Sequence, residues 1–404
     1  WDKWTRIALV KRILVGLILG AILGIAVPQA TGIAILGDVF VSALKAIAPL
    51  LVFFLVISSL CNAGKSHGGV IKTVIILYMF STVLAAVIAV FASMAFPVKM
   101  TLANAATDTS APQGIVEVLN NLLLNVVANP VSSLVNANYV GILMWAVLLG
   151  LAFRVADKMT KKVLADVADG ISMVVTWIIN LAPFGIFGLV FNTVSTNGLD
   201  IFTTYGKLLL LLVGCMLFIY FVTNPLLVYW CIRQNPYPLI FQCLKRSALT
   251  AFFTRSSAAN IPVNMKVCEE MGLDRDTYSV TIPLGATINM DGAAITITVM
   301  TMATAFTLGI HVDIPTAIIL SLLAALSACG ASGVAGGSLL LIPMACSLFG
   351  ISDDISMQVV AVGFIIGVVQ DSVETALNSS SDLLLSASAE FRQWRLEGKE
   401  IKFK

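Results

Sequence analysis

Long apolar runs separated by short polar connections make up most of this chain. They lie near residues 12–35, 37–60, 70–97, 139–153, 163–196, 203–232, 277–310 and 355–378. A helix needs about 20 apolar residues to cross the hydrocarbon core of a bilayer, and most of these runs supply them. The pattern predicts an all-α polytopic membrane protein with eight transmembrane helices.

Two further apolar segments, 239–272 and 315–350, have a different pattern. Each has two short arms around a polar tip, TRSSAANIP in the first and SACGASGVAGGS in the second. An arm of roughly 10–15 residues is too short to cross a bilayer alone. We therefore expect two re-entrant helical hairpins, whose tips are buried in protein or line a watery cavity.

A span with a polar interruption follows each hairpin. The first carries GATINMDGAA at 285–294, and the second carries DSVETALNSSSD at 371–382. Paired interruptions of this kind are typical of transporters built from inverted repeats, which bind their substrate near the membrane midplane. The sequence therefore predicts a site where the two breaks and the two hairpin tips meet.

The composition agrees with a membrane protein, since 58% of the 404 residues are hydrophobic and only 11% are charged. Lysine and arginine precede the first run and recur in alternate connections, so the positive-inside rule places both termini in the cytoplasm. The net charge of +2 says little about partners, and no nucleic-acid partner is expected. The seven cysteines lie in apolar runs and are expected to pack there, and the two histidines have no metal-ligand spacing.

The break at 285–294 offers the oxygen ligands that suit Na⁺. Gly285 and Gly292 permit unwinding, which frees carbonyl groups, while Asn289 and Asp291 add side-chain oxygens. The alternative is that these two polar residues only cap a kinked helix.

One helical face of the last run carries the other candidate ligands. Asp371, Thr375, Asn378 and Asp382 follow at i, i+4, i+7 and i+11. Asn378 and Asp382 offer Na⁺ the same types of oxygen ligand as Asn289 and Asp291. Asp371 could hold an ammonium group, and the start of a half-helix at a hairpin tip, with Ser256 and Ser257, could hold a carboxylate. An α-amino acid carries both groups, although an aspartate in a membrane helix can also be structural.

The third run places Tyr78, Ser81 and Thr82 on one helix face, where they could add cation ligands. Hydroxyl groups in membrane helices more often bond their own backbone or a neighbouring helix. This signal is weak by itself.

With these motifs, the chain resembles the glutamate-transporter-like family of dicarboxylate/amino-acid:cation symporters. The resemblance rests on the tip TRSSAAN, the NMDG break, the glycine-rich second tip and the DxxxTxxNxxxD face, and it covers nearly the whole chain. It implies a homotrimer in the bacterial inner membrane, with a fixed scaffold and a transport domain that moves as an elevator. The implied scaffold is 12–66 and 98–199, the implied transport domain is 69–97 and 203–390, and 391–404 is a cytoplasmic tail.

The resemblance also implies roles for individual residues. The implied substrate-binding residues are Ser256, Ser257, Ala293, Gly333, Val334, Asp371, Glu374, Thr375 and Asn378. The implied sodium ligands are Tyr78, Ser81, Thr82, Gly285, Thr287, Asn289, Met290, Asp291, Ala328, Cys329, Ala331, Asn378 and Asp382.

The chain departs from the acid-transporting members at two positions. They have an arginine where this chain has Glu374 and a threonine where it has Ala293, and both groups hold a side-chain carboxylate in those relatives. A small neutral amino acid such as serine or threonine is therefore the expected substrate, with an acidic amino acid or dicarboxylate as the alternative. We expect Arg255 to pair with Glu374, because a buried carboxylate needs a partner.

Other classes remain open at this point. Asp291 and Asp371 could form the catalytic pair of an intramembrane aspartyl protease, because two aspartates can share a proton. The chain has no GxGD element, so we expect no enzyme activity. A channel is another alternative, which sodium-driven accumulation of substrate would exclude.

Overall fold

The computed structural model describes residues 7, 9–62, 69–102, 123–124, 127–136, 138–198, 201–329, 331 and 336–401. Within these ranges the chain is helical and contains no strand. Six of the described helices are long and apolar enough to cross a membrane. The all-α prediction is thus confirmed, while the count of eight spans stays a prediction.

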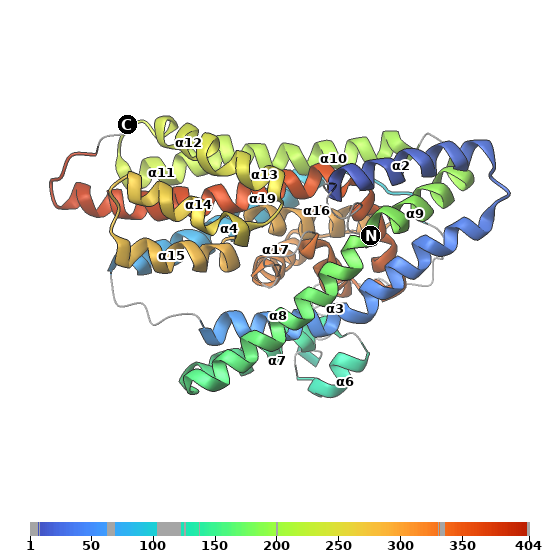
Figure 1. Ribbon diagram of the computed structural model, residues 1–404, viewed down its shortest axis with the longest axis horizontal. Coiled ribbons are helices and arrows are strands. Elements are labelled where there is room, and N and C mark those ends of the chain that lie inside the picture. Colours follow the sequence, from blue (N-terminus) through green and yellow to red (C-terminus); the bar gives the residue numbers. More distant parts are fainter. Residues whose placement is uncertain are drawn as a thin grey trace.

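One group of helices comes from the first half of the chain. Its members are α2 (Leu9–Ala26), α3 (Ile35–Asn62), α6 (Pro130–Val135), α7 (Tyr139–Ala152), α8 (Lys158–Asn180) and α9 (Ala182–Asn197). Helix α2 packs along α9, and α3 contacts α7, α8 and α9. Figure 1 shows α3 and α8 running obliquely to the long axis of the molecule.

Helix α2 approaches α9 through three glycines spaced four residues apart, Gly16, Gly20 and Gly24. A Cβ atom at Gly20 would lie 2.6 Å from the carbonyl oxygen of Phe187, and one at Gly24 would lie 3.0 Å from that of Phe191. Small residues at this spacing let membrane helices pack backbone to backbone. The hydrophobic pattern alone did not predict this role of the glycines.

The other group surrounds α19 (Asp353–Leu396), a single helix of 44 residues that is mostly buried. At 1.5 Å per residue it is about 66 Å long. Helices α10, α14, α15 and α19 lie nearly parallel in Figure 1. The members that contact α19 include α4 (Gly69–Ala95), α10 (Ile201–Phe218), α11 (Asn224–Ile232), α15 (Arg275–Ile288) and α16 (Asp291–Thr307). A π-helical turn, η3 (Ile219–Thr223), joins α10 to α11.

Both segments predicted as hairpins are helical hairpins in the structure. The first contains α12 (Tyr237–Cys243), η4 (Leu244–Ala248), α13 (Leu249–Thr254) and α14 (Ser257–Glu270). The second contains α17 (Ile314–Ala328), η5 (Gly337–Leu341) and α18 (Ile342–Ser347). Asp313 caps α17, and hydrogen bonds from the Thr316 side chain and backbone lower the pKa of Asp313. Whether the hairpins re-enter the membrane, and the division into scaffold and transport domain, stay predictions.

The helix boundaries differ from three of the apolar runs. The run at 12–35 is split, since α2 ends at Ala26 just before Pro28, which cannot donate a helical hydrogen bond. The run at 163–196 is divided into α8 and α9 at Leu181, where Pro183 starts the second helix. The last run continues well past residue 378 as helix, because its polar residues face protein.

Candidate functional site

The predicted break in the NMDG segment is present. Helix α15 ends with Asn289 at φ −101° and ψ 78°, and α16 begins at Asp291. Gly285 lies one turn earlier, where a Cβ atom would be 2.8 Å from the carboxyl carbon of Asp382 and 2.9 Å from the Tyr78 hydroxyl oxygen. The absence of a side chain at Gly285 thus lets α15 approach α4 and α19 at the break.

Asp291 is fully buried and is held by two hydroxyl groups from α4. Ser81 donates to its Oδ2 at 2.7 Å and Thr82 to its Oδ1 at 3.1 Å. The Oδ1 of Asn224 lies 3.5 Å from the Ser81 hydroxyl. In the described part of the chain, no lysine or arginine pairs with Asp291. Ser81, Thr82 and Asp291 therefore meet as expected, and they gather oxygens around an uncompensated negative charge.

Asp382 lies in a second oxygen-rich cluster. The side-chain amide of Asn289 donates to its Oδ1 at 2.9 Å, and the Tyr78 hydroxyl donates to its backbone carbonyl at 2.8 Å. The Asn289 amide also donates to the Ser381 hydroxyl at 2.8 Å. The Oδ1 of Asn289 is buried and accepts no hydrogen bond from any described residue. A buried carbonyl oxygen without a donor, beside a carboxylate, fits a hard cation such as Na⁺.

The remaining predicted sodium ligands lie around the same break. Thr287 bonds its own helix, donating to the Leu284 carbonyl at 2.7 Å. The Met290 N–H donates to the Thr82 hydroxyl at 3.3 Å. The thiol of Cys329, at the end of α17, lies 3.8 Å from the Ile288 carbonyl oxygen. Ala328 directly precedes Cys329, and Ala331 lies two residues after it. The second hairpin tip therefore reaches the unwound segment.

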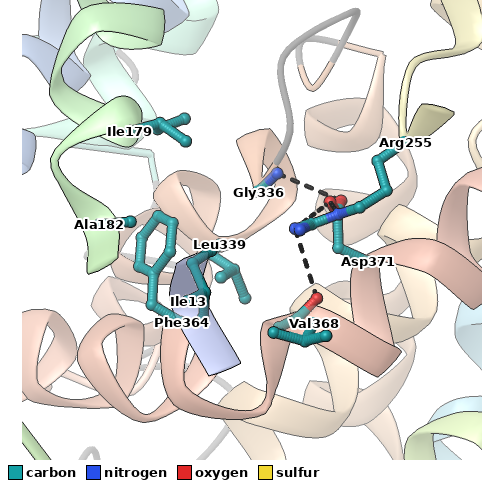
Figure 2. A pocket seen from close by; sticks show the side chains of 10 residues that line it. Ile13, Ile179, Ala182, Arg255, Gly336, Leu339, Phe364, Val368 and Asp371 are labelled. Carbon is teal, nitrogen blue, oxygen red and sulfur yellow. Dashed lines mark hydrogen bonds and ion pairs between the residues drawn. The ribbon is translucent and has the colours of Figure 1, made fainter. Parts of the chain in front are cut away.

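Asp371 is paired with Arg255 at the tip of the first hairpin (Figure 2). The guanidinium Nε and Nη2 lie 2.6 Å and 2.5 Å from its Oδ2, and the Gly336 N–H donates to its Oδ1 at 3.1 Å. Both side chains are at least nine-tenths buried. Arg255 has a left-handed backbone conformation at φ 52°, which ends α13. Asp371 thus joins the two hairpin tips.

The expected ion pair between Arg255 and Glu374 is not present. Glu374 Oε2 instead accepts three neutral donors: Thr296 Oγ1 at 2.7 Å, Ser338 Oγ at 2.9 Å and Gln370 Nε2 at 2.5 Å. These groups already hold the Glu374 carboxylate. Arg255 pairs instead with Asp371, which lies one turn earlier on α19.

Glu374 lies close to the start of α16. A Cβ atom at Gly292 would be 3.0 Å from the Glu374 Cα, so a larger residue would push α16 away from α19. Thr296 and Gln370 also bond one another at 2.7 Å. Thr296, Ser338 and Gln370 were not among the predicted site residues, although Gln370 directly precedes Asp371.

The other predicted substrate-binding residues lie around this pair. Ser256 caps α14 by accepting from the Ala259 N–H, and Ser257 is buried in the first turn of that helix. Thr375 donates to the Asp371 carbonyl at 2.8 Å, and Asn378 Oδ1 accepts from the Gly292 N–H at 2.8 Å. Ala293 is fully buried in α16. Gly333 and Val334 lie outside the described residues.

A small cavity of about 10 Å³ adjoins Asp371, roughly enough for one water molecule. Its lining includes Gly336 near Asp371, and Phe364 beside Ile13 of α2 and Ala182 of α9 (Figure 2). The Arg255–Asp371 pair therefore lies at the junction of the two helix groups.

Two asparagines of α14 fix the first hairpin to α19, and neither was among the predicted site residues. Asn260 Nδ2 donates to the Ser379 hydroxyl, and Asn264 Nδ2 donates to the Ser379 carbonyl, both at 2.8 Å. Their spacing of four residues on one helix face was the available signal.

Broken helices, two helical hairpins and buried aspartates with oxygen ligands define a membrane transporter. The model of the sodium:dicarboxylate symporter family matches residues 9–390. The chain belongs to this family, and the resemblance predicted from its motifs is confirmed.

The chain is also similar over almost its full length to curated relatives. The serine/threonine transporter SstT of Bifidobacterium adolescentis is 58% identical over 401 residues, which cover 99% of this chain and 93% of the relative. The serine/threonine transporter SstT of Streptococcus thermophilus is 56% identical over 395 residues, which cover 98% of each. These names describe transporters and not enzymes.

Proposed function

We propose that this chain is a sodium-coupled symporter that imports serine, threonine and similar small neutral amino acids across the bacterial plasma membrane. The observation that carries the proposal is the buried Glu374 carboxylate, which lies one turn from Asp371 and is held by neutral donors. It stands where acid-transporting members have an arginine. The names of the relatives support the same substrate class.

Asp371 is the proposed ligand for the substrate's ammonium group. In the structure the Arg255 guanidinium pairs with this carboxylate. An ammonium group offers the same charge, so it can replace Arg255 without leaving Asp371 unpaired. The N-terminus of α14, with Ser256 and Ser257, is the proposed site for the substrate's carboxylate, since backbone N–H groups and the helix dipole favour an anion there.

Thr375, Asn378 and the second hairpin complete the proposed substrate site. Thr375 and Asn378 lie on the same face of α19 as Asp371. The backbone at Gly333 and Val334 is proposed to cover the substrate from the second hairpin.

Glu374 is proposed to exclude acidic substrates. Its Oε2 accepts three donors, which fixes the carboxylate in place. A substrate side-chain carboxylate would meet like charge, whereas a hydroxymethyl group would not. Ala293 offers no hydroxyl group to hold such a carboxylate.

Sodium is the proposed coupling ion. The oxygens around Asp382 and Asn289 form one proposed site, and those around Asp291, Ser81 and Thr82 form another. Thr287, Met290 and the second tip near Ala328, Cys329 and Ala331 are proposed to contribute a third. Each group of ligands joins separate helices, so binding of the ion would fix the helices together and prepare the substrate site.

We further propose a homotrimer with both termini in the cytoplasm and an elevator mechanism. The fixed scaffold would contain 12–66 and 98–199, and the moving part would contain 69–97 and 203–390. The small cavity between α2 and α9 on one side and Asp371 on the other supports a boundary at that place.

A dicarboxylate or acidic amino acid is the second candidate substrate, because the family description names dicarboxylates. Glu374 argues against it. An aspartyl protease is a weaker reading still, since Asp291 and Asp371 hydrogen-bond separate partners.

The test is uptake of labelled serine into proteoliposomes with an imposed sodium gradient, with threonine, alanine, aspartate and glutamate as competitors. We expect accumulation that requires sodium and that threonine inhibits while aspartate does not. Uptake without sodium, or stronger inhibition by aspartate than by threonine, contradicts the proposal. Liposomes with potassium replacing sodium are the control.

A further inference from the structure

An apolar groove lies between the end of α4 and residues 207–218 of α10, away from the substrate site. Its volume is about 820 Å³, within the range of pockets that hold small ligands. Small residues, Ala92 and Ala95 of α4 and Gly214 of α10, line it together with the larger Phe91 and Phe218. Gly214 leaves room in the groove, because a Cβ atom there would meet nothing within 4 Å.

The two helices that form this groove run in opposite directions. Arg395, near the end of α19, donates to the Cys231 carbonyl at the end of α11. A separate surface pocket is lined by both Trp394, the neighbour of Arg395, and Gly69 at the start of α4. The continuous helix from α10 to α11 therefore ends where α4 begins, so Lys207 near its start lies at the same end of the groove as Phe96.

The length of the groove matches one leaflet of a bilayer. Lys207 and Phe218 mark its extent along α10, and eleven residues at 1.5 Å per residue span about 16 Å. Half of a hydrocarbon core of about 30 Å is about 15 Å. Phe96 and Leu210 are 69% and 74% exposed, so the apolar lining is open to the surroundings.

Lys207 is the one charged residue that lines this groove within the described part of the chain. It is exposed, and it makes no ion pair or hydrogen bond with any other described residue. A lysine on a membrane helix extends its ammonium group toward the headgroup region, where anionic headgroups offer the partner. The groove therefore combines an apolar channel of one-leaflet length with a cation at one end.

We propose that this groove binds one anionic phospholipid, with an acyl chain between α4 and α10 and its phosphate on Lys207. The inference requires a membrane environment, and it does not depend on which substrate the protein carries. The shape of the groove suits an acyl chain, and Lys207 favours a negatively charged headgroup.

The test is native mass spectrometry of the full chain released from nanodiscs that contain equal amounts of phosphatidylglycerol and phosphatidylcholine. We expect the unmodified protein to retain phosphatidylglycerol with about a fivefold preference, the effect of one lysine near anionic lipid. Lys207→Gln should retain lipid without that preference. Gly214→Leu and Ala95→Phe, which fill the groove from opposite helices, should lose the retained lipid.

Gly206→Leu is the matched control. Gly206 also lies on α10 with open space around its missing Cβ, but it does not line the groove. This variant should retain phosphatidylglycerol like the unmodified protein. The proposal is overturned if both filling variants retain as much lipid as Gly206→Leu, if Lys207→Gln keeps the headgroup preference, or if the unmodified protein retains no lipid.

Discussion

The guanidinium of Arg255 lies against the carboxylate of Asp371, with Nε 2.6 Å from Oδ2, although the two residues are 116 positions apart. The pair joins the tip of the first hairpin to α19 at a buried position. Any cationic ligand of Asp371 must therefore displace a charged group of the protein itself. If Asp371 binds the substrate's ammonium group as proposed, substrate binding and the position of the first hairpin tip are coupled through this exchange.

Arg255→Gln should destabilise the substrate-free protein by about 3–5 kcal/mol, because Asp371 becomes a buried charge without its partner. Serine with sodium should then raise the melting temperature more in the variant than in the unmodified protein, since the ammonium group restores the pair. Thermal unfolding with and without both ligands measures this difference.

Arg246→Gln is the control for that experiment. Arg246 pairs with Glu270 at the surface, where both side chains are more than a third exposed, so its loss should have little effect. Equal ligand-induced shifts in Arg255→Gln and Arg246→Gln would show that Arg255 does not compete with substrate.

Ser338→Ala should weaken serine binding, because Ser338 ties the second hairpin to Glu374 at 2.9 Å. A hydrogen bond to a charged group contributes about 1.5–3 kcal/mol, so the half-saturating serine concentration should rise by about tenfold or more. Ser347→Ala is the matched control, because among the described residues that hydroxyl bonds only the Met344 carbonyl of its own segment. An unchanged serine affinity in Ser338→Ala would show that the contact between the second hairpin and Glu374 does not contribute to substrate binding.

Asp382→Asn should weaken sodium activation of uptake. The charge count of a site sets its affinity for a hard cation, and we expect the half-saturating sodium concentration to rise at least about tenfold. Asp353→Asn, a change of the same type at the start of α19, should leave sodium dependence unaltered. Normal sodium activation in Asp382→Asn would contradict the assignment of this carboxylate to the ion.

Gly20→Leu should destabilise the packing of α2 on α9. A side chain there meets the Phe187 carbonyl at 2.6 Å, so the backbones must separate, at a cost of about 1–3 kcal/mol or more. Thermal unfolding in detergent measures the effect, with Gly206→Leu as the control in open space. If the two variants had the same melting temperature, the close approach of α2 to α9 would not contribute to stability.

Helical periodicity was enough to predict the face that carries Asp371 and Asp382, because both lie on one helix. It could not show that Tyr78 reaches the Asp382 carbonyl, since this contact joins residues 304 positions apart. The pairing of Arg255 was predicted wrongly for the same reason. Asp371 and Glu374 lie one turn apart, and the donors to Glu374 decide which of them needs a cation. One of these donors, Ser338, comes from the second hairpin.

The apolar pattern also could not predict the boundaries of the first helices. Hydropathy does not distinguish a long run from two helices divided at a proline, as at Pro28 and Pro183. The glycines of α2 contribute little to hydropathy, so their role in close packing is visible only when α9 is placed beside them.

Because α19 is unbroken, substrate selectivity near Asp371 and ion binding near Asp382 could change independently during evolution. Asp371 and Glu374 lie about 16 Å and 12 Å along the axis from Asp382, and a continuous helix keeps these separations constant. A substitution near Asp371 can therefore change which amino acid is accepted while the geometry around Asp382 is preserved. Lineages within the family could thus acquire new nutrients and still draw on the same ion gradient.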